Sequence, residues 1–275
     1  MFITRPSWLA FAAVFVIFGP AFSQVIPVPF ESSGVFGSSE PTQTFLWEAR
    51  QANAVLVMIP GGEGHLGLTP ARTELGGFYE RVLKPLADET MTSGKVHVVV
   101  FDSPDILPSG DFYPTSRASD DHLSRIESVV RYYKERYGKP VWLMGHSNGA
   151  ISVSEYIRSR GDTVNGAIFS SSRAGVKISD TFASPVLFLQ HRKDGCAKVS
   201  ARSVVDVYAT IKLAGKTAVA FNWIDGGSSE GNPCYSGYHM YFGAETQVFR
   251  AIDSFIANPK AEADRPALPE SGPAD

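Results

Sequence analysis

The most informative part of the sequence is the stretch Trp142-Leu143-Met144-Gly145-His146-Ser147-Asn148-Gly149-Ala150. It starts with a short apolar run that is typical of a strand buried on both faces, and the residues after it, 150–157, can continue as a helix. The Gly-x-Ser-x-Gly pattern between them places Ser147 at a strand-to-helix corner. Such a corner strains the backbone of its central residue and leaves no room for side chains two positions away, which explains both glycines. The stretch therefore predicts a nucleophilic Ser147 at the start of a helix.

Similar apolar runs recur along the chain, separated by longer amphipathic segments. Because the runs are continuous and do not alternate with polar residues, they favour parallel strands covered on both faces. We expect an α/β fold in which a mostly parallel central sheet has helices on both faces, with the site at the carboxyl ends of the strands. The predicted strands are Val55 to Ile59, Val96 to Phe101, Val141 to Met144, Ala167 to Phe169, Val186 to Gln190 and Ala218 to Ile224, with Thr42 to Trp47 as an edge strand.

Three helices are expected from their apolar stripes: Ser119 to Tyr137, Val199 to Leu213 and Gly243 to Ala257. In the first of them, Ser119 or Asp120 can cap the start, and Gly138 follows the last turn. These segments alternate with the predicted strands, as an α/β sheet requires.

The first residues have the layout of a secretory signal peptide. Residues 1–23 contain a single charged residue, Arg5, then an apolar run and a small-residue site that ends at Ser23. The run is short for a membrane span, so we expect cleavage after Ser23 and a secreted or periplasmic protein with no stable membrane association. An uncleaved N-terminal anchor is the alternative.

The composition fits one globular domain. With 275 residues, of which 44% are hydrophobic, the chain can bury a sizeable core, and we expect a single domain over residues 24–258. The Pro-, Gly- and Ser-rich residues 24–41 are expected to run irregularly over the surface, and the Pro-rich, charged residues 259–275 to form a disordered tail. The net charge of −3, with basic and acidic residues mixed, argues against a nucleic-acid partner. The sequence does not indicate an oligomeric state.

Two loops after predicted strands carry the partners that a serine nucleophile needs. Asp194 lies just beyond the strand 186–190, and His239 lies after the next strand and ahead of the last helix. An imidazole that accepts the serine proton and a carboxylate that orients the imidazole make the hydroxyl an effective nucleophile. Asp225 is the alternative acid and His65 the alternative base.

In the order Ser147, Asp194, His239 and in the Gly-x-Ser-x-Gly corner, the chain resembles the α/β-hydrolase fold superfamily, in a serine esterase-like form whose subfamily we do not place. The resemblance covers residues 55–257. It implies a mostly parallel sheet with the nucleophile after its central strand. Many members insert a helical cap, but Ser170 to Pro185 is too short for one, so we expect no large cap domain.

The chemistry of acyl transfer also requires two N–H groups that bind the developing oxyanion. The residue after the nucleophile, Asn148, supplies one through its backbone, and we expect Gly62, or otherwise Glu63, to supply the second. Their loop has Pro60 where many esterases of the superfamily have histidine. An alternative is a dinucleotide-binding turn, because residues 62–67 match Gly-x-Gly-x-x-Gly, but Pro70 follows where the phosphate-binding helix should be under way.

The two cysteines, Cys196 and Cys234, are expected to form a disulfide that ties the acid loop to the histidine loop, with buried free thiols as the alternative. No metal site and no cofactor are expected. His65 and Tyr238 are candidate substrate contacts. The loop 102–118 is expected to form one wall of an open site, with Phe112, Tyr113 and Arg117 as further candidate contacts.

These features lead to the hypothesis of an exported serine hydrolase that cleaves a small-molecule carboxylic ester through an acyl-enzyme. The same site could instead cleave an amide or peptide bond, or transfer the acyl group to an alcohol. A hydrolase-fold binding protein with an idle triad is the alternative outside the enzymes.

Overall fold

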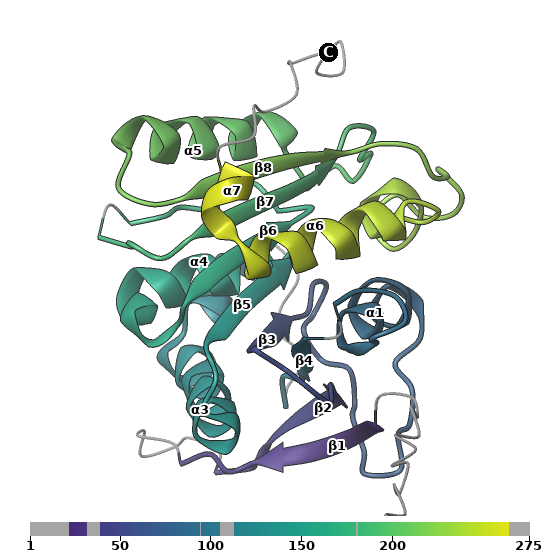
Figure 1. Cartoon of the computed structure of the whole chain (residues 1–275), viewed down its shortest axis with the longest axis vertical. Helices are drawn as coiled ribbons and strands as arrows, with labels where there is room; N and C mark the ends of the chain where they lie inside the picture. The colour runs from purple at the N-terminus through teal and green to yellow at the C-terminus, as the bar shows by residue number, and fades with distance from the viewer. Residues whose placement is uncertain (1–21, 32–38, 94, 105–112, 180, 264–275) are drawn as a thin grey trace, which may run out of the picture.

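The computed structural model describes residues 22–31, 39–93, 95–104, 113–179 and 181–263. An eight-stranded sheet runs through the middle of these residues, in the order β1-β2-β4-β3-β5-β6-β7-β8 (Figure 1). All neighbours from β4 to β8 are parallel, whereas β2 is antiparallel to both β1 and β4. The predicted α/β class with a mostly parallel sheet is confirmed. The strands are β1 Phe22–Val28, β2 Thr42–Glu48, β3 Ala54–Ile59, β4 Val96–Phe101, β5 Val141–His146, β6 Gly166–Ser170, β7 Val186–His191 and β8 Val219–Ile224.

Helices cover both faces of the sheet (Figure 1). One apolar layer packs the sheet against α3, α4 and α5, and the other packs it against η1, α1 and α6. The three predicted helices are confirmed as α3, α5 and α6. Ser119 caps α3 by accepting the N–H of His122, and Gly138 ends the helix in the left-handed conformation. The helical elements are η1 Tyr79–Leu83, α1 Lys84–Ala87, α2 Tyr113–Arg117, α3 Asp120–Tyr137, α4 Gly149–Arg160, η2 Gly161–Thr163, α5 Ala201–Ala214, η3 Gly237–Met240, α6 Glu245–Ala257 and α7 Pro259–Ala263.

The prediction of an irregular segment over residues 24–41 is wrong at its start. Strand β1 pairs with β2, so the predicted strand at 42–47 is not at the edge of the sheet. Ile26, Val28 and Phe30 are buried and alternate with the exposed Pro27 and Pro29. The two prolines suggested a loop, but an outermost strand tolerates proline where the missing N–H faces solvent.

The C-terminal boundary also differs from the expectation. The prediction of a disordered tail from residue 259 on is wrong at its start, because Pro259–Ala263 is helical and lies against α6 and β8. Glu262 and Ala263 are buried there, and the Lys212 ammonium donates to the carbonyl of Ala263. The domain therefore extends to Ala263. The rest of the predicted tail and residues 1–21 of the predicted signal peptide lie outside the described residues.

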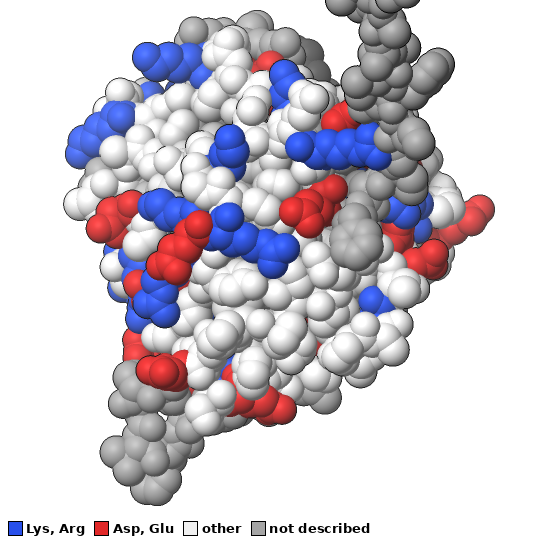
Figure 2. Space-filling view, turned by 60° about the horizontal axis from the view of Figure 1, so that its bottom comes forward, with Lys and Arg blue, Asp and Glu red and all other residues white. Residues whose placement is uncertain are grey.

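The surface carries both signs of charge. On the face shown in Figure 2, basic and acidic side chains are interspersed over a largely uncharged surface. Arg160, for example, joins α4 to α3 through Asp120 at 2.7 Å and Glu127 at 3.0 Å. Within the described residues, no helix combines the length and apolarity that a membrane span requires.

Candidate active site

Ser147 occupies the corner between β5 and α4, and its backbone is strained. Its φ of 52° lies in the left-handed region that residues with a side chain rarely adopt. A Cβ at position 145 would lie 2.4 Å from the carbonyl oxygen of Gly149, and a Cβ at position 149 would lie 2.0 Å from that of Ile59. Both glycines are thus required by space, and the tight corner leaves Ser147 partly exposed at the carboxyl end of β5.

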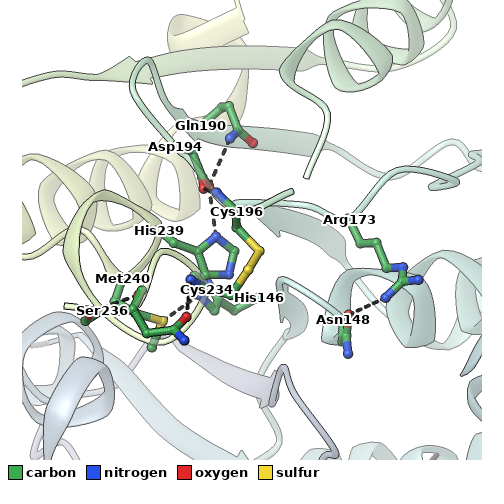
Figure 3. The surroundings of a disulfide bond; sticks show 11 residues. His146, Asn148, Arg173, Gln190, Asp194, Cys196, Cys234, Ser236, His239 and Met240 are labelled. Carbon is green, nitrogen blue, oxygen red and sulfur yellow. Dashed lines mark hydrogen bonds and ion pairs between the residues drawn. A yellow bond between two sulfur atoms is a disulfide. The ribbon is translucent and has the colours of Figure 1, made fainter. Parts of the chain in front are cut away.

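Asp194 and His239 form a buried pair although they are far apart in the sequence (Figure 3). His239 Nδ1 lies 2.9 Å from Asp194 Oδ2, and their side chains are 1% and 2% exposed. The carboxylate also accepts the Cys196 N–H at 3.0 Å and the Gln190 side-chain amide at 3.3 Å. The alternative acid, Asp225, is instead exposed and pairs with Arg192.

The other ring nitrogen of His239 is available for chemistry. Nε2 is buried and has no hydrogen-bond partner among the described residues. Buried polar atoms are normally paired, so an orphan of this kind calls for an explanation. A hydrogen bond from Nδ1–H to Asp194 leaves Nε2 as the acceptor nitrogen of a neutral imidazole, the form that a general base requires.

His146 links the nucleophile corner to the histidine loop. Its ring lies 5.0 Å from the His239 ring and stacks on Phe78 at 4.4 Å. Its nitrogens lie 3.0 Å from Ser170 Oγ and 3.3 Å from Met240 Sδ. Burial, and then the nearby His239, hold the pKa of His146 well below its usual value, so it stays neutral and adds no charge beside His239.

The loop after β3 lies against Ser147. A Cβ at Gly61 would meet Ser147 Cβ at 2.9 Å and Ser147 Oγ at 3.6 Å. The Asn148 side-chain amide donates to the Gly62 carbonyl oxygen at 2.8 Å. The structure therefore brings the loop that contains both candidates for the second oxyanion donor, Gly62 and Glu63, close to Ser147 and Asn148.

Arg117 differs from its expected place in the wall of the site. Its side chain is completely buried, and its guanidinium donates to the carbonyl oxygens of Pro60 and Gly62 at 3.0 Å and of Gly61 at 3.4 Å. The expectation that it contacts substrate is wrong, because the group lies beneath the loop. Phe112 lies outside the described residues.

The remaining candidate substrate contacts, His65 and Tyr238, both contact other residues of the protein. His65 Nδ1 lies 2.7 Å from the Ser103 carbonyl oxygen and 3.8 Å from Asp102, so it is not the partner of the acid. Tyr238 stacks on His191, with ring centroids 4.5 Å apart, which packs the histidine loop on β7. Whether either residue contacts substrate stays a prediction.

The dinucleotide alternative is wrong. Gly62, Gly64 and Gly67 all have positive φ, but no helix follows them directly, and the next helical element begins at Tyr79. The N–H groups of Leu66 and Leu68 are instead bound by the Asp102 carboxylate, the latter at 2.7 Å. Without a helix N-terminus, the segment lacks the phosphate site of a dinucleotide-binding turn.

The predicted disulfide is confirmed. Cys196 and Cys234 are bonded across a sequence separation of 38 residues, and the bond lies beside the Asp194–His239 pair (Figure 3). It joins the loop after β7 to the loop that leads into η3. The two loops that carry the proposed acid and base are thus tied covalently as well as by the hydrogen bond between those side chains.

A pocket of about 380 Å³ borders the histidine loop. Met240, which contacts His146, belongs to its lining, and the exposed aromatic residues Tyr235 and Phe242 add to it. Residues 75–79 and Arg81 also line it. Most of the lining is apolar. Among the described residues, no three His, Cys, Asp or Glu side chains are grouped as metal ligands.

Comparisons with known proteins agree on the fold. The sequence matches no protein-family model and no curated protein. The structure matches XC6422 from Xanthomonas campestris, an α/β serine hydrolase without a lid, with 13% identity and a TM-score of 0.52 over 91% of this chain and 99% of that one. It matches Est1E from Butyrivibrio proteoclasticus with 13% identity and a TM-score of 0.53 over 86% and 99% of the two chains. TT1662 from Thermus thermophilus matches with 14% identity and a TM-score of 0.52 over 80% and 94%.

Proposed function

We propose, on the basis of the α/β-hydrolase fold without a large cap, that this chain is an exported serine hydrolase that cleaves carboxylic esters through an acyl-enzyme. The observation that carries the proposal is the buried Asp194–His239 pair, in which His239 Nε2 has no partner among the described residues. The His239 ring lies 5.0 Å from the ring of His146, the residue before the strained Ser147. A carboxylate, an imidazole and a serine on such a corner are the parts that activate a hydroxyl for acyl transfer.

In the first half of the reaction, Ser147 Oγ attacks the ester carbonyl carbon and His239 Nε2 takes the hydroxyl proton. The carbonyl oxygen becomes an oxyanion, which the N–H groups of Asn148 and Gly62 bind. When the C–O bond to the alcohol breaks, the imidazolium returns its proton to the departing oxygen. The acyl group stays on Ser147.

In the second half, a water molecule gives a proton to His239 Nε2 and adds to the acyl carbon. Collapse of the second tetrahedral intermediate breaks the bond to Oγ, which regains the proton from His239, and the acid leaves. Throughout, Asp194 keeps the Nδ1–H of His239 in place and stabilises the positive imidazolium.

Support for an ester substrate comes from the pocket and the structural neighbours. The pocket at Met240 offers an apolar surface beside the histidine loop, which suits an apolar acyl or alcohol group. Est1E has been solved with ferulic acid bound. Amide cleavage and acyl transfer use the same parts and remain the alternative activities, and an idle triad is the alternative from another class.

Export rests on the N-terminal sequence and on the disulfide. Residues 1–23 have the signal-peptide layout, and a disulfide persists in oxidising compartments. Cleavage after Ser23 would leave Gln24–Val28 to pair with β2.

A fluorophosphonate probe and a panel of chromogenic esters and amides test this proposal. We expect the probe to label the wild type once, at Ser147, and not to label Ser147→Ala, because only an activated serine attacks the phosphorus. We expect ester turnover to disappear in the same variant. An unlabelled wild type, or equal labelling of the two proteins, would show that the triad is idle.

A further inference from the structure

The loop that faces the nucleophile cannot hold its own shape through side chains. We call residues 60–62, Pro60-Gly61-Gly62, the oxyanion loop. None of these residues has a polar side chain. Proline restricts the backbone, whereas glycine leaves it freer than other residues do. Gly62 has a φ of 54°, in the left-handed region. The conformation that presents its N–H groups must therefore be imposed from outside.

Arg117 is the residue that contacts every carbonyl of this loop. It ends α2 and has no exposed surface. Nη1 donates to the Pro60 oxygen at 3.0 Å, and Nη2 donates to the Gly62 oxygen at 3.0 Å and to the Gly61 oxygen at 3.4 Å. One rigid, planar group thus sets the direction of three successive carbonyls, which a flexible ammonium could not do equally well.

The direction of these carbonyls fixes the direction of the N–H groups. Across a trans peptide the C=O and the following N–H point to opposite sides. With the Gly61 carbonyl turned to Arg117, the Gly62 N–H is turned away from it. Ser147 packs directly against Gly61, so the loop separates the buried guanidinium from the nucleophile.

The carbonyl of Gly62 is held from a second direction. The Asn148 side-chain amide donates to it at 2.8 Å, and Arg173 donates to the Asn148 side-chain oxygen at 3.3 Å. Arg173 reaches toward Asn148 from the side opposite the Asp194–His239 pair (Figure 3). The residue that offers one oxyanion N–H therefore also braces the loop that offers the other.

The guanidinium is itself fixed by α3 and α4. Arg117 Nη1 donates to Ser152 Oγ at 3.0 Å, and Ser152 Oγ lies 2.9 Å from His122 Nε2. Because arginine only donates, the hydroxyl is left to donate to His122, which is neutral. Burial, followed by the charges of Arg117 and Arg125, lowers the pKa of His122 to about 3.

We propose that Arg117 is a positioning residue for the hydrolase activity: its guanidinium orients and polarises the peptides of the oxyanion loop so that the Gly62 N–H meets the oxyanion. A charge-assisted hydrogen bond to a carbonyl strengthens the N–H on the other side of the same peptide, and the effect is larger in a site of low dielectric constant. The inference rests on the proposed function and adds to it a residue outside the triad.

The test compares Arg117→Met and Arg117→Lys with a matched control, Arg125→Met. Arg125 is an equally buried arginine, but it binds the Glu40 carbonyl, Thr42 and Asp121, away from the oxyanion loop. For each protein we would measure kcat and KM with a chromogenic ester, the melting temperature, and the Ki of an alkyl trifluoromethyl ketone. Addition of Ser147 Oγ to this ketone transfers the hydroxyl proton to His239 and leaves a hemiketal oxyanion, so the Ki reports oxyanion binding.

For Arg117→Met we expect kcat to fall roughly 10- to 100-fold and the Ki to rise by a similar factor, with little change in KM. This is less than the loss of about 10²- to 10³-fold in kcat that follows removal of an oxyanion donor, because the variant keeps the Gly62 N–H and loses only the group that orients it. Arg117→Lys should recover part of both. Arg125→Met should lower the melting temperature and leave kcat and Ki near their wild-type values. A folded Arg117→Met that retains the wild-type kcat and Ki would overturn the inference.

Should Arg117→Met fail to fold, Arg117→Lys decides the matter. It keeps a positive charge at the position but replaces the planar fork that reaches all three carbonyls. We expect the same linked change in kcat and Ki, smaller in size, and wild-type kcat and Ki in Arg117→Lys would then overturn the inference. A wild type that neither cleaves esters nor reacts with the fluorophosphonate would instead refute the proposed function, and the inference with it.

Discussion

At the scale of single residues, the site depends on a few positions that are constrained by lack of space or by hydrogen bonds. A methyl group at Gly145 or Gly149 would collide with backbone, and one at Gly61 would collide with Ser147. Asp194 is equally constrained, since its two oxygens accept from His239, Cys196 and Gln190. Gln190 is a contact that the sequence did not reveal, because it lies in the apolar run of β7 and looks there like an ordinary strand residue.

The role of Asp194 can be tested by Asp194→Asn, with Asp225→Asn as the matched control. The amide has nearly the shape of the carboxylate, but its NH₂ group can donate to His239 Nδ1 and so favours the wrong tautomer. We expect kcat to fall by about 10³- to 10⁴-fold, as in other triads that lose their acid. Steady-state ester hydrolysis would measure it. If both variants keep wild-type kcat, or if Asp225→Asn loses more than Asp194→Asn, then Asp194 is not the acid.

At the scale of elements, the site is an assembly of loops that follow neighbouring strands. The loops after β3, β5, β7 and β8 supply the oxyanion loop, Ser147, Asp194 and His239 in turn. These strands are parallel and follow one another in the sheet, with β6 between β5 and β7, so their carboxyl ends lie at one edge. The Cys196–Cys234 bond then joins the loop that follows β7 to the loop that follows β8.

Removing this bond should affect both stability and activity. For the double variant Cys196→Ala/Cys234→Ala we expect a loss of about 4 kcal/mol of unfolding free energy, the chain-entropy value for a loop of this length. Misplacement of the acid and histidine loops should also lower kcat, by up to about 10²-fold. Denaturant unfolding and ester hydrolysis give the two values, and wild type treated with reductant should shift in the same direction. An unchanged unfolding midpoint would mean that the bond contributes nothing.

At the scale of the whole molecule, the two apolar layers bury imidazoles in the neutral state. His122 and His146 lie in the interior, and burial lowers the pKa of each, to about 3 for His122. In the unfolded chain a histidine has its ordinary pKa, near 6.5. Below that pH the unfolded state binds more protons than the folded state, so the stability present above pH 6.5 is lost as the pH falls toward the folded pKa.

For His122 alone, the loss between pH 7 and pH 5 should be about 2 kcal/mol, since one pKa unit corresponds to 1.36 kcal/mol. The amide oxygen of His122→Gln can still accept from Ser152. We expect the unfolding free energy of this variant to depend less steeply on pH, because about one proton fewer is taken up on unfolding. Denaturant titrations of both proteins at pH 7, 6 and 5 would measure this. Parallel curves for wild type and variant would show that His122 does not take up a proton on unfolding.

Much of the fold could be read from the sequence because its signals are local. The continuous apolar runs predicted the six strands from β3 to β8, and the stripe with its cap at Ser119 and stop at Gly138 predicted α3. Where local signals conflicted, the prediction was wrong. Pro27 and Pro29 hid the edge strand β1, and α7 was taken for a disordered tail, because what orders its short, charged sequence is packing against α6 and β8.

The chemistry of the site follows the same division. Spacing and chain order are enough to propose Ser147 and His239 with an acid at Asp194 or Asp225, to pair the two cysteines, and to expect an oxyanion loop after β3. The choice of Asp194 over Asp225, the neutral His146 beside His239 and the place of Arg117 beneath the loop depend on contacts between residues far apart in the chain. Such contacts leave no local pattern, because a buried arginine that binds three carbonyls looks in sequence like one exposed to water. Only the packing of α2 against α4 and the loop after β3 places Arg117 beneath that loop.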